Sequence, residues 1–476
     1  MSADSLLTGK LNVINIGLPA FADDLKHNGA NVTHLDWQPP KTQDPAVLKA
    51  LDALEAPEVA RRIDDANELA IERMNGAQPF LIDVVRAGDV IGELGEHVVL
   101  HAGPPIDWDD MCGPMRGAVA GALVYEGWAD SLEVAMELAG SGAIRFAPNH
   151  HFDAVGPMTG MTTQSMPVMV VENRAYGNRA YCAINEGLGK VMRFGGNDES
   201  VIARLKWLET VLGPMMGKAL RACGGIDLQN IIARGLTMGD EMHQRNVACT
   251  SLTLRELAPA MASVTSDADL LSEALAFMAG NDQFFLNIAM ATGKAIMDPV
   301  RGIENCSVVS AMCRNGTNFG IRLSATDADW YSAPVEMPSG LYFPGFSEAD
   351  ANPDMGDSTI VETIGLGGFA MAAAPAVAGF VGAGKASEAS EYTKRMWEIT
   401  SSRNLKWTIP ALDFAGVPTG IDVRKVVASG LPPTINTGIA HREPGIGQVG
   451  AGVVNAPMSC FEQAVVALAE AMEVTR

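Results

Sequence analysis

The sequence lacks closely spaced cysteine pairs, because no two cysteines have C-x-x-C spacing. The seven cysteines are widely scattered: Cys112, Cys182, Cys223, Cys249, Cys306, Cys313 and Cys460. An odd number of dispersed cysteines is typical of reduced thiols in a cytosol. We therefore expect a cytoplasmic protein with neither a disulfide framework nor a structural zinc site.

Basic residues are also scarce. The 476 residues include 34 lysines and arginines against 56 aspartates and glutamates, which gives a formal net charge of −22. A protein of this charge has no field that attracts a polyanion, so no nucleic-acid partner is expected.

Long hydrophobic runs are missing as well. Residues 1–21 lack a basic stretch followed by a continuous apolar segment, so we expect no secretion signal. Residues 363–384 carry no charge over 22 positions, and a membrane span is the alternative for them. Because this segment contains six glycines and Pro375, we predict a glycine loop that leads into a buried alanine-rich helix, and no membrane partner.

Several enzyme signatures are absent too. The chain has no G-x-S-x-G elbow, no P-loop and no protein-kinase motif set. These absences exclude the common nucleophile and nucleotide sites. Polar clusters on loops remain as the source of any chemistry.

The hydrophobic pattern predicts an α/β fold of mixed α+β character. Residues 11–16, 21–27 and 32–37 read as strand, helix and strand, a Rossmann-like unit whose turn at 17–19 could receive an anion but lacks G-x-G-x-x-G. Residues 46–74 read as helical and 79–85 as a buried strand. Nearly all of 197–297 reads as helical, including 241–261.

Two hairpins are predicted farther along. Residues 168–173 and 179–185 flank one turn, and 307–313 and 318–323 flank Asn315-Gly316, the stronger turn signal. Near the end, Gly445, Gly447, Gly450 and Gly452 could approach a ligand or simply pack against another strand, before a helix over 459–473. We expect a Rossmann-like N-terminal domain (1–98), a mixed α/β domain with histidine loops (99–196), a helical domain (197–300) and a mixed α/β C-terminal domain (301–476).

Two loops concentrate titratable side chains: HAGPPIDWDDMCGPMRGA over residues 101–118 and RFAPNHHFDAVGPMTGM over 145–161. Neutral donors, a guanidinium and a carboxylate together suit an oxyanion or a carboxylated substrate. The candidate catalytic residues are His101, His150, His151 and Asp153, and the candidate substrate-binding residues are Gly103, Arg116, Asn149 and Thr159. The alternative is that most of these histidines are hydrogen-bonded structural groups.

A metal is not expected in these loops. His150, His151 and Asp153 could supply ligands, but adjacent residues of an extended segment point to opposite faces. No cofactor motif accompanies them, so we predict neither a metal nor a cofactor.

Two further clusters could bind a ligand. In LTMGDEMHQRN, at a predicted helix start, His243 and Asn246 would share one helical face beside Arg245. The alternative is a solvated helix start, since Asp240 and Glu241 are favoured there by the helix dipole. Asn185 precedes Arg193, which could clamp an anion next to two glycines or lie on the surface. The candidate substrate-binding residues here are Asn185, Arg193, His243, Arg245 and Asn246.

The chain resembles the AllG family, also called YlbE/YahG-like. LNVINIGLPAFADDLKHNGANVTHLDWQPP, HAGPPIDWDDMCGPMRGA, FAPNHHFDAVGPMTGM and GDEMHQRN look like that family's shared blocks, and the likeness spans nearly the whole chain. The length and the opening look closer to the YahG-like branch. The carbamoyltransferase signatures S-T-R-T-R and H-P-x-Q are absent, so any carbamoyl chemistry would be of an unconventional kind.

The resemblance implies a subunit of an oxamate carbamoyltransferase that acts with an FdrA-like protein, which is similar to succinyl-CoA synthetase. Such an enzyme of allantoin breakdown converts oxalurate and phosphate to oxamate and carbamoyl phosphate. Two alternatives are an acyl-CoA or acyl-phosphate enzyme and a non-catalytic scaffold subunit. We expect small carboxylated substrates, phosphate, an FdrA-like partner and a homo-oligomer.

Phosphorolysis of an N-carbamoyl compound requires an anion clamp, a donor to the ureido carbonyl and an acid for the departing nitrogen. We expect Arg116 and the glycine-rich loops to act as the clamp and His150 or His151 as the acid or donor. His101 or His243 would orient the substrate carboxylate. On this view His151→Ala abolishes turnover, and unaltered turnover in the assembled enzyme removes His151 from the site.

Overall fold

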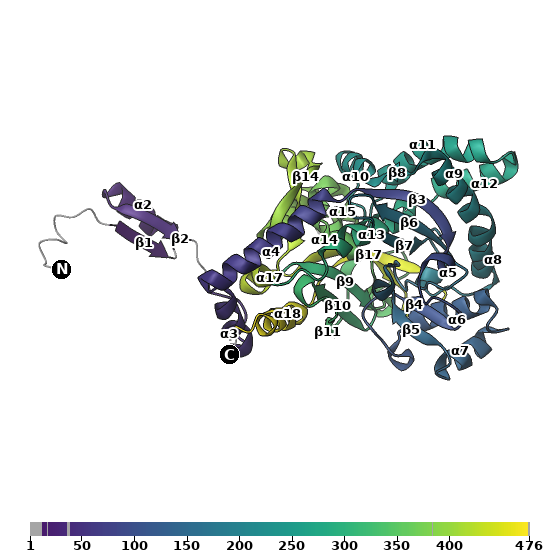
Figure 1. The fold of residues 1–476 in the computed structure, drawn as a ribbon, viewed down its shortest axis with the longest axis horizontal. Helices are drawn as coiled ribbons and strands as arrows, with labels where there is room; N and C mark the ends of the chain where they lie inside the picture. Colours follow the sequence, from purple (N-terminus) through teal and green to yellow (C-terminus); the bar gives the residue numbers. More distant parts are fainter. Residues whose placement is uncertain (1–11, 17, 36–38, 383, 475–476) are drawn as a thin grey trace, which may run out of the picture.

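The computed structural model describes residues 12–16, 18–35, 39–382 and 384–474, and Figure 1 shows a mixed α/β fold. The predicted fold class is confirmed. None of the described helices is long and apolar enough to cross a membrane. A short buried helix, α14 (Ile360–Thr363), ends where the uncharged stretch begins. The stretch itself forms two short pieces, the fully buried η8 (Gly367–Ala373) and the partly exposed α15 (Pro375–Phe380).

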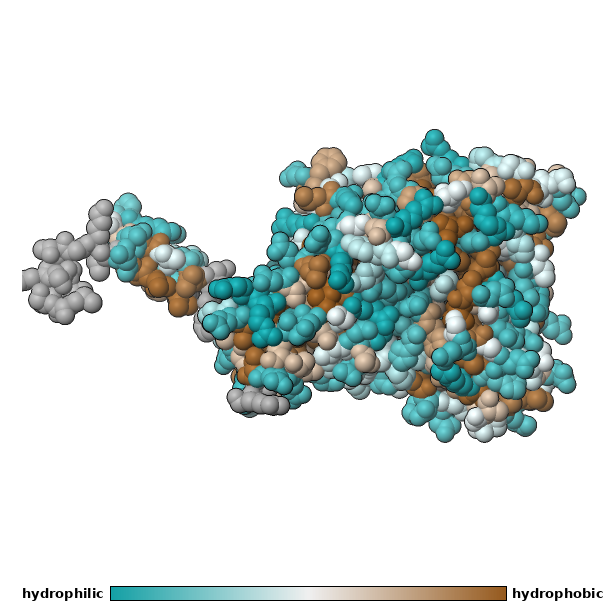
Figure 2. Space-filling view, in the orientation of Figure 1, coloured by the Kyte–Doolittle hydropathy of each residue, from teal (hydrophilic) through white to brown (hydrophobic). Residues whose placement is uncertain are grey.

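The N-terminal unit is the predicted strand, helix and strand. β1 (Asn12–Ile16) and β2 (Asn31–Leu35) pair in parallel and are joined by α2 (Pro19–His27). Residues 11, 17, 36 and 37, which the prediction included, lie outside the described residues. Figure 1 places the unit at one end, apart from the main body. Brown side chains gather on it in Figure 2, and its exposed apolar residues are Ile14, Ile16, Leu18, Phe21 and Leu35.

Two helices follow where the sequence predicted one helical stretch. α3 (Pro45–Leu54) begins at Asp44, whose carboxylate accepts the N–H groups of Ala46 and Val47. α4 (Pro57–Gly76) begins at a proline, which disfavours helical geometry in the residue before it and so separates the two helices. α3 packs against α18 (Met458–Ala471), the C-terminal helix that the sequence predicted.

The first sheet is antiparallel, in the order β7-β6-β3-β8. Its strands are β3 (Pro79–Arg86), β6 (Pro167–Asn173), β7 (Arg179–Ala183) and β8 (Ile226–Asp227). β6 and β7 are the first predicted hairpin. Because β3 pairs with β6, this sheet combines segments that lie on both sides of residue 98.

Helices cover this sheet, as the sequence predicted for 197–297. They are α8 (Glu199–Trp207), a π-helical turn η4 (Leu208–Leu212), α9 (Gly213–Cys223), α10 (Leu228–Thr237), α11 (Val247–Val264), α12 (Ala268–Ala279) and α13 (Phe284–Met297). Every residue of α13 is buried, since this helix packs against β6 and β7 on one side and against α14 and β9 (Val309–Asn315) on another.

The prediction of a helix over 241–261 is wrong at its start. Residues 238–246 form a loop, and α11 begins only at Val247. The Asp240 carboxylate accepts the N–H of Cys249 at 2.8 Å and so caps the first turn of α11 from outside the helix. His243 and Asn246 therefore share no helical face.

A second antiparallel sheet has the order β11-β10-β9-β13, and β9 and β10 are the second predicted hairpin. The strands other than β9 are β10 (Asn318–Leu323), β11 (Tyr331–Pro334) and β13 (Met355–Gly356). The C-terminal part adds β12 (Ser339–Tyr342), β14 (Thr400–Ile409), β15 (Ala415–Ile421), β16 (Thr434–Ala440) and β17 (Gln448–Asn455), with helices α16 (Ala389–Glu398) and α17 (Val423–Ser429).

Two of the C-terminal glycines are explained by strand packing. A Cβ at Gly450 would lie 2.4 Å from the carbonyl oxygen of Leu341, and one at Gly452 would lie 2.6 Å from that of Ser339. Both contacts are shorter than real Cβ atoms allow, so the close pairing of β17 with β12 requires glycine there.

Candidate active site

The two histidine loops begin at neighbouring strand ends. β4 (Val98–His101) and β5 (Arg145–Pro148) are parallel, and His101 lies opposite Pro148. α5 (Ala87–Val90) precedes them, and α6 (Gly113–Glu126) and α7 (Leu132–Gly140) connect them. Because the carboxyl ends of parallel strands meet at one edge, His101 and the residues after Pro148 lie together.

Asp357 joins these two loops, directly after β13. Its buried carboxylate accepts the N–H of Gly103 at 2.8 Å on one oxygen. The other oxygen accepts the N–H of Gly156 at 2.9 Å and the side-chain amide of Asn149 at 3.1 Å. Burial raises the pKa of Asp357 to about 7, against the opposing effect of these hydrogen bonds. The charge of Asp357 therefore changes near neutral pH.

Several buried polar atoms near Asp357 have no hydrogen-bond partner among the described residues. They are Nε2 of His101, both ring nitrogens of His150 and Oδ1 of Asn149. Burial lowers the pKa of His101 to about 4 and that of His150 well below its usual value, so both imidazoles are neutral at pH 7. An unsatisfied buried polar atom costs about 1–3 kcal/mol. Such atoms gathered in one place indicate a site for a polar ligand or for water.

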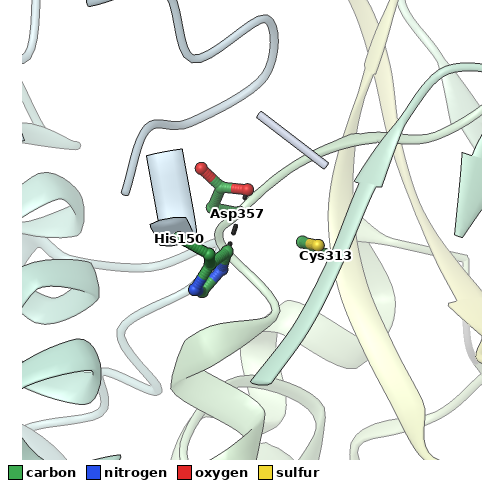
Figure 3. Close-up of side chains that lie close together, drawn as sticks. All are labelled: His150, Cys313 and Asp357. Carbon is green, nitrogen blue, oxygen red and sulfur yellow. Dashed lines mark ion pairs between the residues drawn. The ribbon is translucent and has the colours of Figure 1, made fainter. Parts of the chain in front are cut away.

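His150, Cys313 and Asp357 come close enough to be considered as metal ligands, since one donor atom from each lies within 4.8 Å of the others. Figure 3 shows the imidazole facing the carboxylate, with 3.8 Å between Nε2 and Oδ1. Burial raises the pKa of the Cys313 thiol well above its usual value, which disfavours the thiolate that a metal needs. Besides burial, Lys294 and two arginines lower the pKa of His150, and they also oppose a further cation. The donor set fits a metal poorly, and the metal-free site stays a prediction.

A second buried cluster starts at the next residue, Ser358. Its Oγ lies 2.8 Å from Nε2 of His243, and Nδ1 of His243 lies 2.7 Å from Oε1 of Glu362. Nη1 of Arg314 donates to the same Ser358 oxygen at 2.9 Å. These four residues are at most 3% exposed, so the whole chain of hydrogen bonds is shielded from solvent.

The loop before α11 is held in place by Glu241. Its buried carboxylate accepts the backbone N–H groups of His243 at 3.2 Å and Arg245 at 2.7 Å, and the side-chain amide of Asn436 at 3.2 Å. Burial raises the pKa of Glu241 to about 7. Glu241 thus fixes the position of the His243 ring instead of starting a helix.

Arg193 is a buried guanidinium beside these clusters, on the turn η3 (Met192–Phe194). It is 4% exposed, and no carboxylate of the described residues lies within ion-pair distance of it. It donates to the carbonyl of Gly187 at 2.9 Å and to the side chain of Gln283 at 3.0 Å, while its Nε has no partner. Burial lowers the pKa of Arg193 to about 10, so it keeps its charge at pH 7. A buried cation of this kind is available to an anion.

Two cavities meet at Arg193 and Pro157. Each has a volume of only about 20 Å³, which is room for about one water molecule. One is lined by polar side chains that include His243, Gln244, Gln283, Ser358, Thr437 and Gln448. The other is lined by residues that include Gly156, Gly160, Asn185, Glu186 and Asn287. Thr159 connects them to the histidine loop, because its N–H donates to the carbonyl of Arg193 at 3.0 Å.

The structure therefore brings together most of the predicted binding residues. Gly103, Asn149 and His150 lie at the Asp357 carboxylate, and His101 ends the strand just before Gly103. Thr159, Arg193 and His243 line or adjoin the cavities. Asn185 lines a cavity, and its side-chain nitrogen donates to Asn287 Oδ1 at 2.8 Å and to the Gln283 carbonyl at 3.0 Å. Asn246 is buried and its side-chain nitrogen approaches the His243 carbonyl at 3.4 Å.

Four predicted residues lie elsewhere. His151 is exposed on the turn η2 (Asn149–Phe152), and its Nε2 accepts the indole N–H of Trp330 at 2.8 Å. It lines a separate surface cavity with Asp153. Arg116 lies over the ring of Trp108, with 5.4 Å to the centroid. Arg245 is exposed, with Nε 3.6 Å from an Asp240 carboxylate oxygen.

The adjacent histidines do face different sides, although they lie in a 3₁₀ turn and not in the extended segment that the prediction assumed. Sequence reasoning did not find Arg314, Asp357, Ser358 or Glu362. The local sign for Arg314 was its position next to the Asn-Gly hairpin turn. The other three lie in residues 348–362, a segment with five carboxylates that could have indicated them: Glu348, Asp350, Asp354, Asp357 and Glu362.

The comparison with known proteins identifies the family. The family model described as "Oxamate carbamoyltransferase subunit AllG" matches residues 144–358. The chain is 51% identical to the Oxamate carbamoyltransferase subunit AllG of Escherichia coli (strain K12) over 86% of its own length and 98% of that protein's. The chain belongs to the AllG family. The predicted resemblance is confirmed, and the matched range includes Asn149, His150, Arg193, His243 and Ser358.

Two other members of known sequence or structure are similar. The chain is 44% identical to the uncharacterized protein YahG of Escherichia coli (strain K12), over 98% of this chain and 99% of that one. A crystal structure of a conserved protein of unknown function from Enterococcus faecalis V583 superposes with a TM-score of 0.85 at 46% identity. The superposition covers 87% of this chain and 99% of the Enterococcus faecalis chain.

Proposed function

We propose that this member of the AllG family is a catalytic subunit of a carbamoyltransferase that acts with an FdrA-like partner. The reaction is the phosphorolysis of a carboxylated N-carbamoyl compound, such as oxalurate, to carbamoyl phosphate and oxamate, or its reverse. Support comes from the relative named Oxamate carbamoyltransferase subunit AllG. As parts of the same proposal, the complex is cytoplasmic and this chain forms a homo-oligomer within it.

The observation that carries the proposal is the buried Arg193 guanidinium, which lines two small cavities and has no ion-pair partner among the described residues. Both substrates are anions, because oxalurate has a carboxylate and phosphate is doubly charged near neutral pH. A guanidinium that is already desolvated loses little hydration when it binds an oxyanion, and its planar fork matches two oxygens. In this proposal Arg193 is the main anion clamp, and Arg116 is a second candidate at the surface.

The neutral histidines supply the remaining chemistry. With Nδ1–H donated to the carbonyl of Ala102 at 2.8 Å, Nε2 of His101 is free to accept a hydrogen bond from a substrate N–H. His150, with both nitrogens free, can donate to the ureido carbonyl or to the substrate carboxylate. Asp357 holds the two histidine loops in place beside His150 through its hydrogen bonds to Gly103, Gly156 and Asn149. His151 and Asp153 stay candidates only for a part of the site that the partner completes at the surface.

The experiment measures carbamoyl phosphate formation from oxalurate and phosphate by the purified chain, by the FdrA-like partner, and by their mixture. The proposal predicts activity only in the mixture. If the assembled complex has no activity, oxalurate phosphorolysis is not its reaction. Activity that depends on coenzyme A supports the acyl-CoA alternative. Activity of the partner alone at the rate of the mixture reduces this chain to a scaffold.

A further inference from the structure

A linear chain of hydrogen bonds joins Ser358, His243 and Glu362. Substrate binding alone does not require such a chain. Hydrogen-bond chemistry fixes the direction of each proton in it. Arg314 can only donate, so Ser358 Oγ accepts from Nη1 at 2.9 Å. The single hydroxyl hydrogen is then free to point to Nε2 of His243 at 2.8 Å. Nδ1–H of the same ring donates to Glu362 Oε1 at 2.7 Å, which also accepts the N–H of Gly368 at 3.1 Å.

We infer that Ser358 is a nucleophile that carries the carbamoyl group between the donor and phosphate, with His243 as its base and Glu362 as the positioning residue. This inference rests on the proposed function and deepens it. A serine hydroxyl is a weak nucleophile until an adjacent base takes its proton and a third group orients that base. Ser358, His243 and Glu362 meet this geometric requirement, although the sequence has no G-x-S-x-G motif.

Arg314 adds a feature that favours the reactive form of the serine. Its guanidinium is held by two contacts to Asp354, at 2.7 and 3.3 Å, and by the Thr437 hydroxyl at 3.1 Å. A fixed cationic donor at the Ser358 oxygen stabilises the negative charge that develops there when His243 removes the proton. A structural serine needs no such donor opposite a base.

The small cavity next to Ser358 has hydrogen-bonding groups that match those of a carbamoyl group. Ser358 and His243 line it together with Gln244, whose buried Oε1 has no partner among the described residues. A carbamoyl group has an amine that donates and a carbonyl that accepts. The free Gln244 oxygen can accept from this amine, and Arg193 on the same wall can hold the anionic part of either substrate.

The reaction balances in two steps. In the first, Ser358 Oγ bonds to the ureido carbon and its proton moves to His243 Nε2; the carbon–nitrogen bond to oxamate breaks, and that nitrogen takes the proton from His243. In the second, a phosphate oxygen attacks the carbamoyl-serine ester and the bond to Oγ breaks. The proton of hydrogen phosphate passes through His243 to Oγ, which restores the serine and releases carbamoyl phosphate.

In the competing mechanism the carbamoyl group passes directly from oxalurate to phosphate. The two mechanisms predict different results when phosphate is absent. A carbamoyl-serine intermediate lets isotopically labelled oxamate enter oxalurate in the absence of phosphate, whereas direct transfer does not. The experiment follows this exchange in the assembled complex and maps the quenched protein by peptide mass spectrometry. The expected result is exchange, together with one carbamoyl group on the peptide that contains Ser358.

The variants are Ser358→Ala, Ser358→Cys and, as a matched control, Ser310→Ala. Ser310 is as buried as Ser358, 3% in both cases, but its hydroxyl has no hydrogen-bond partner among the described residues. Ser358→Ala should lose exchange and adduct, with at least about a hundredfold lower turnover, while Ser310→Ala keeps both. Ser358→Cys keeps a nucleophile and should still gain the carbamoyl group, which separates lost chemistry from lost folding.

Cyanate serves as a second probe, because it carbamoylates an activated serine directly and needs no knowledge of the natural donor. Wild-type chain in the complex should be labelled at Ser358 and Ser358→Ala should not. Carbamoyl phosphate formation without exchange or adduct overturns the inference and leaves the proposed function standing. A complex that forms no carbamoyl phosphate overturns the proposed function. The cyanate experiment then tests the nucleophile independently: a label on Ser358 supports the inference that Ser358 is a nucleophile, and the absence of a label overturns that inference.

Discussion

Two buried clusters meet at Asp357 and Ser358, and they differ in how their histidines are paired. In the loops that Asp357 joins, both ring nitrogens of His150 and Nε2 of His101 have no partner among the described residues. Beside Ser358, both ring nitrogens of His243 are hydrogen-bonded. An unpaired buried nitrogen is available to a ligand, whereas an imidazole between a hydroxyl and a carboxylate can accept and pass on a proton. The difference assigns substrate binding to the first cluster and proton transfer to the second.

The largest effect is expected when the complete chain is broken. His243→Ala should lower kcat of the assembled complex by about 10²–10⁴-fold, because it removes a general base, with a smaller effect on KM. His27→Ala, on the exposed end of α2, is the control and should keep the wild-type rate. An unchanged kcat in His243→Ala contradicts the assignment of proton transfer to this cluster.

Glu362→Gln tests the positioning role in the same cluster. The imidazolium that forms at His243 when it takes the serine proton loses its carboxylate partner, so kcat should fall while KM stays close to the wild-type value. A purely structural role would lower the amount of folded protein and leave kcat per folded complex unchanged. Steady-state rates of the variant and the wild type, normalised to the amount of assembled complex, check the difference.

The unpaired cluster should respond in substrate affinity. His150→Ala removes a buried donor and should lower kcat/KM by about 10–100-fold, the effect of one hydrogen bond to a charged group. His151→Ala, at the adjacent exposed position, should cost less. Initial rates of both variants in assembled complexes make the comparison, and a larger loss in His151→Ala would return the catalytic role to the surface histidine.

A smaller effect on stability is expected where the backbone approaches Asp357. A Cβ at Gly103 would lie 2.5 Å from Cβ of Asn315, at a φ of +87°. Gly127 has a φ of +73° but nothing within 4 Å of such a Cβ. Gly127→Ala should cost about 1–2 kcal/mol from the left-handed backbone alone, and Gly103→Ala about 1–3 kcal/mol more from overpacking. Urea unfolding of the two variants measures this difference, and equal costs would contradict the tight contact.

A separate effect is expected in the pH dependence of stability. Burial raises the pKa of Asp357 from its model-compound value of 3.8 to about 7. Between these values the folded protein holds a proton that the unfolded chain has released, so the free energy of unfolding falls as pH rises through this window. Asp357→Asn removes this contribution, and the wild-type minus variant difference should decrease from pH 4 to 7 and then level off. A difference that is flat in pH contradicts the raised pKa.

Local rules predicted much of the fold. The Asn-Gly turn after Arg314, the strand-helix-strand unit at the start and the helices over 197–297 follow from short-range patterns that the structure confirms. The two histidine loops were also found from composition, because His101 and His150 follow strands whose ends meet. The domain boundaries at 98, 196 and 300 stay predictions.

The second cluster could not be predicted in this way. Ser358 and Glu362 lie 115 and 119 positions from His243, and no periodicity or spacing connects residues at such separations. The loop before α11 was misjudged because acidic residues near a helix start are usually explained by the helix dipole. Asp240 and Glu241 instead bind backbone N–H groups from outside the helix, an arrangement that depends on tertiary contacts.

On this proposal the buried guanidinium of Arg193, which has no ion-pair partner among the described residues, binds the anionic substrate of this chain. The most direct test is calorimetric titration of oxamate into the assembled complex, wild type against Arg193→Met. We predict binding by the wild-type complex and at least about tenfold weaker binding by the variant, the effect of losing one charge-assisted contact. Equal affinity in the two complexes, with both verified as assembled, would contradict the claim and place the anion site elsewhere.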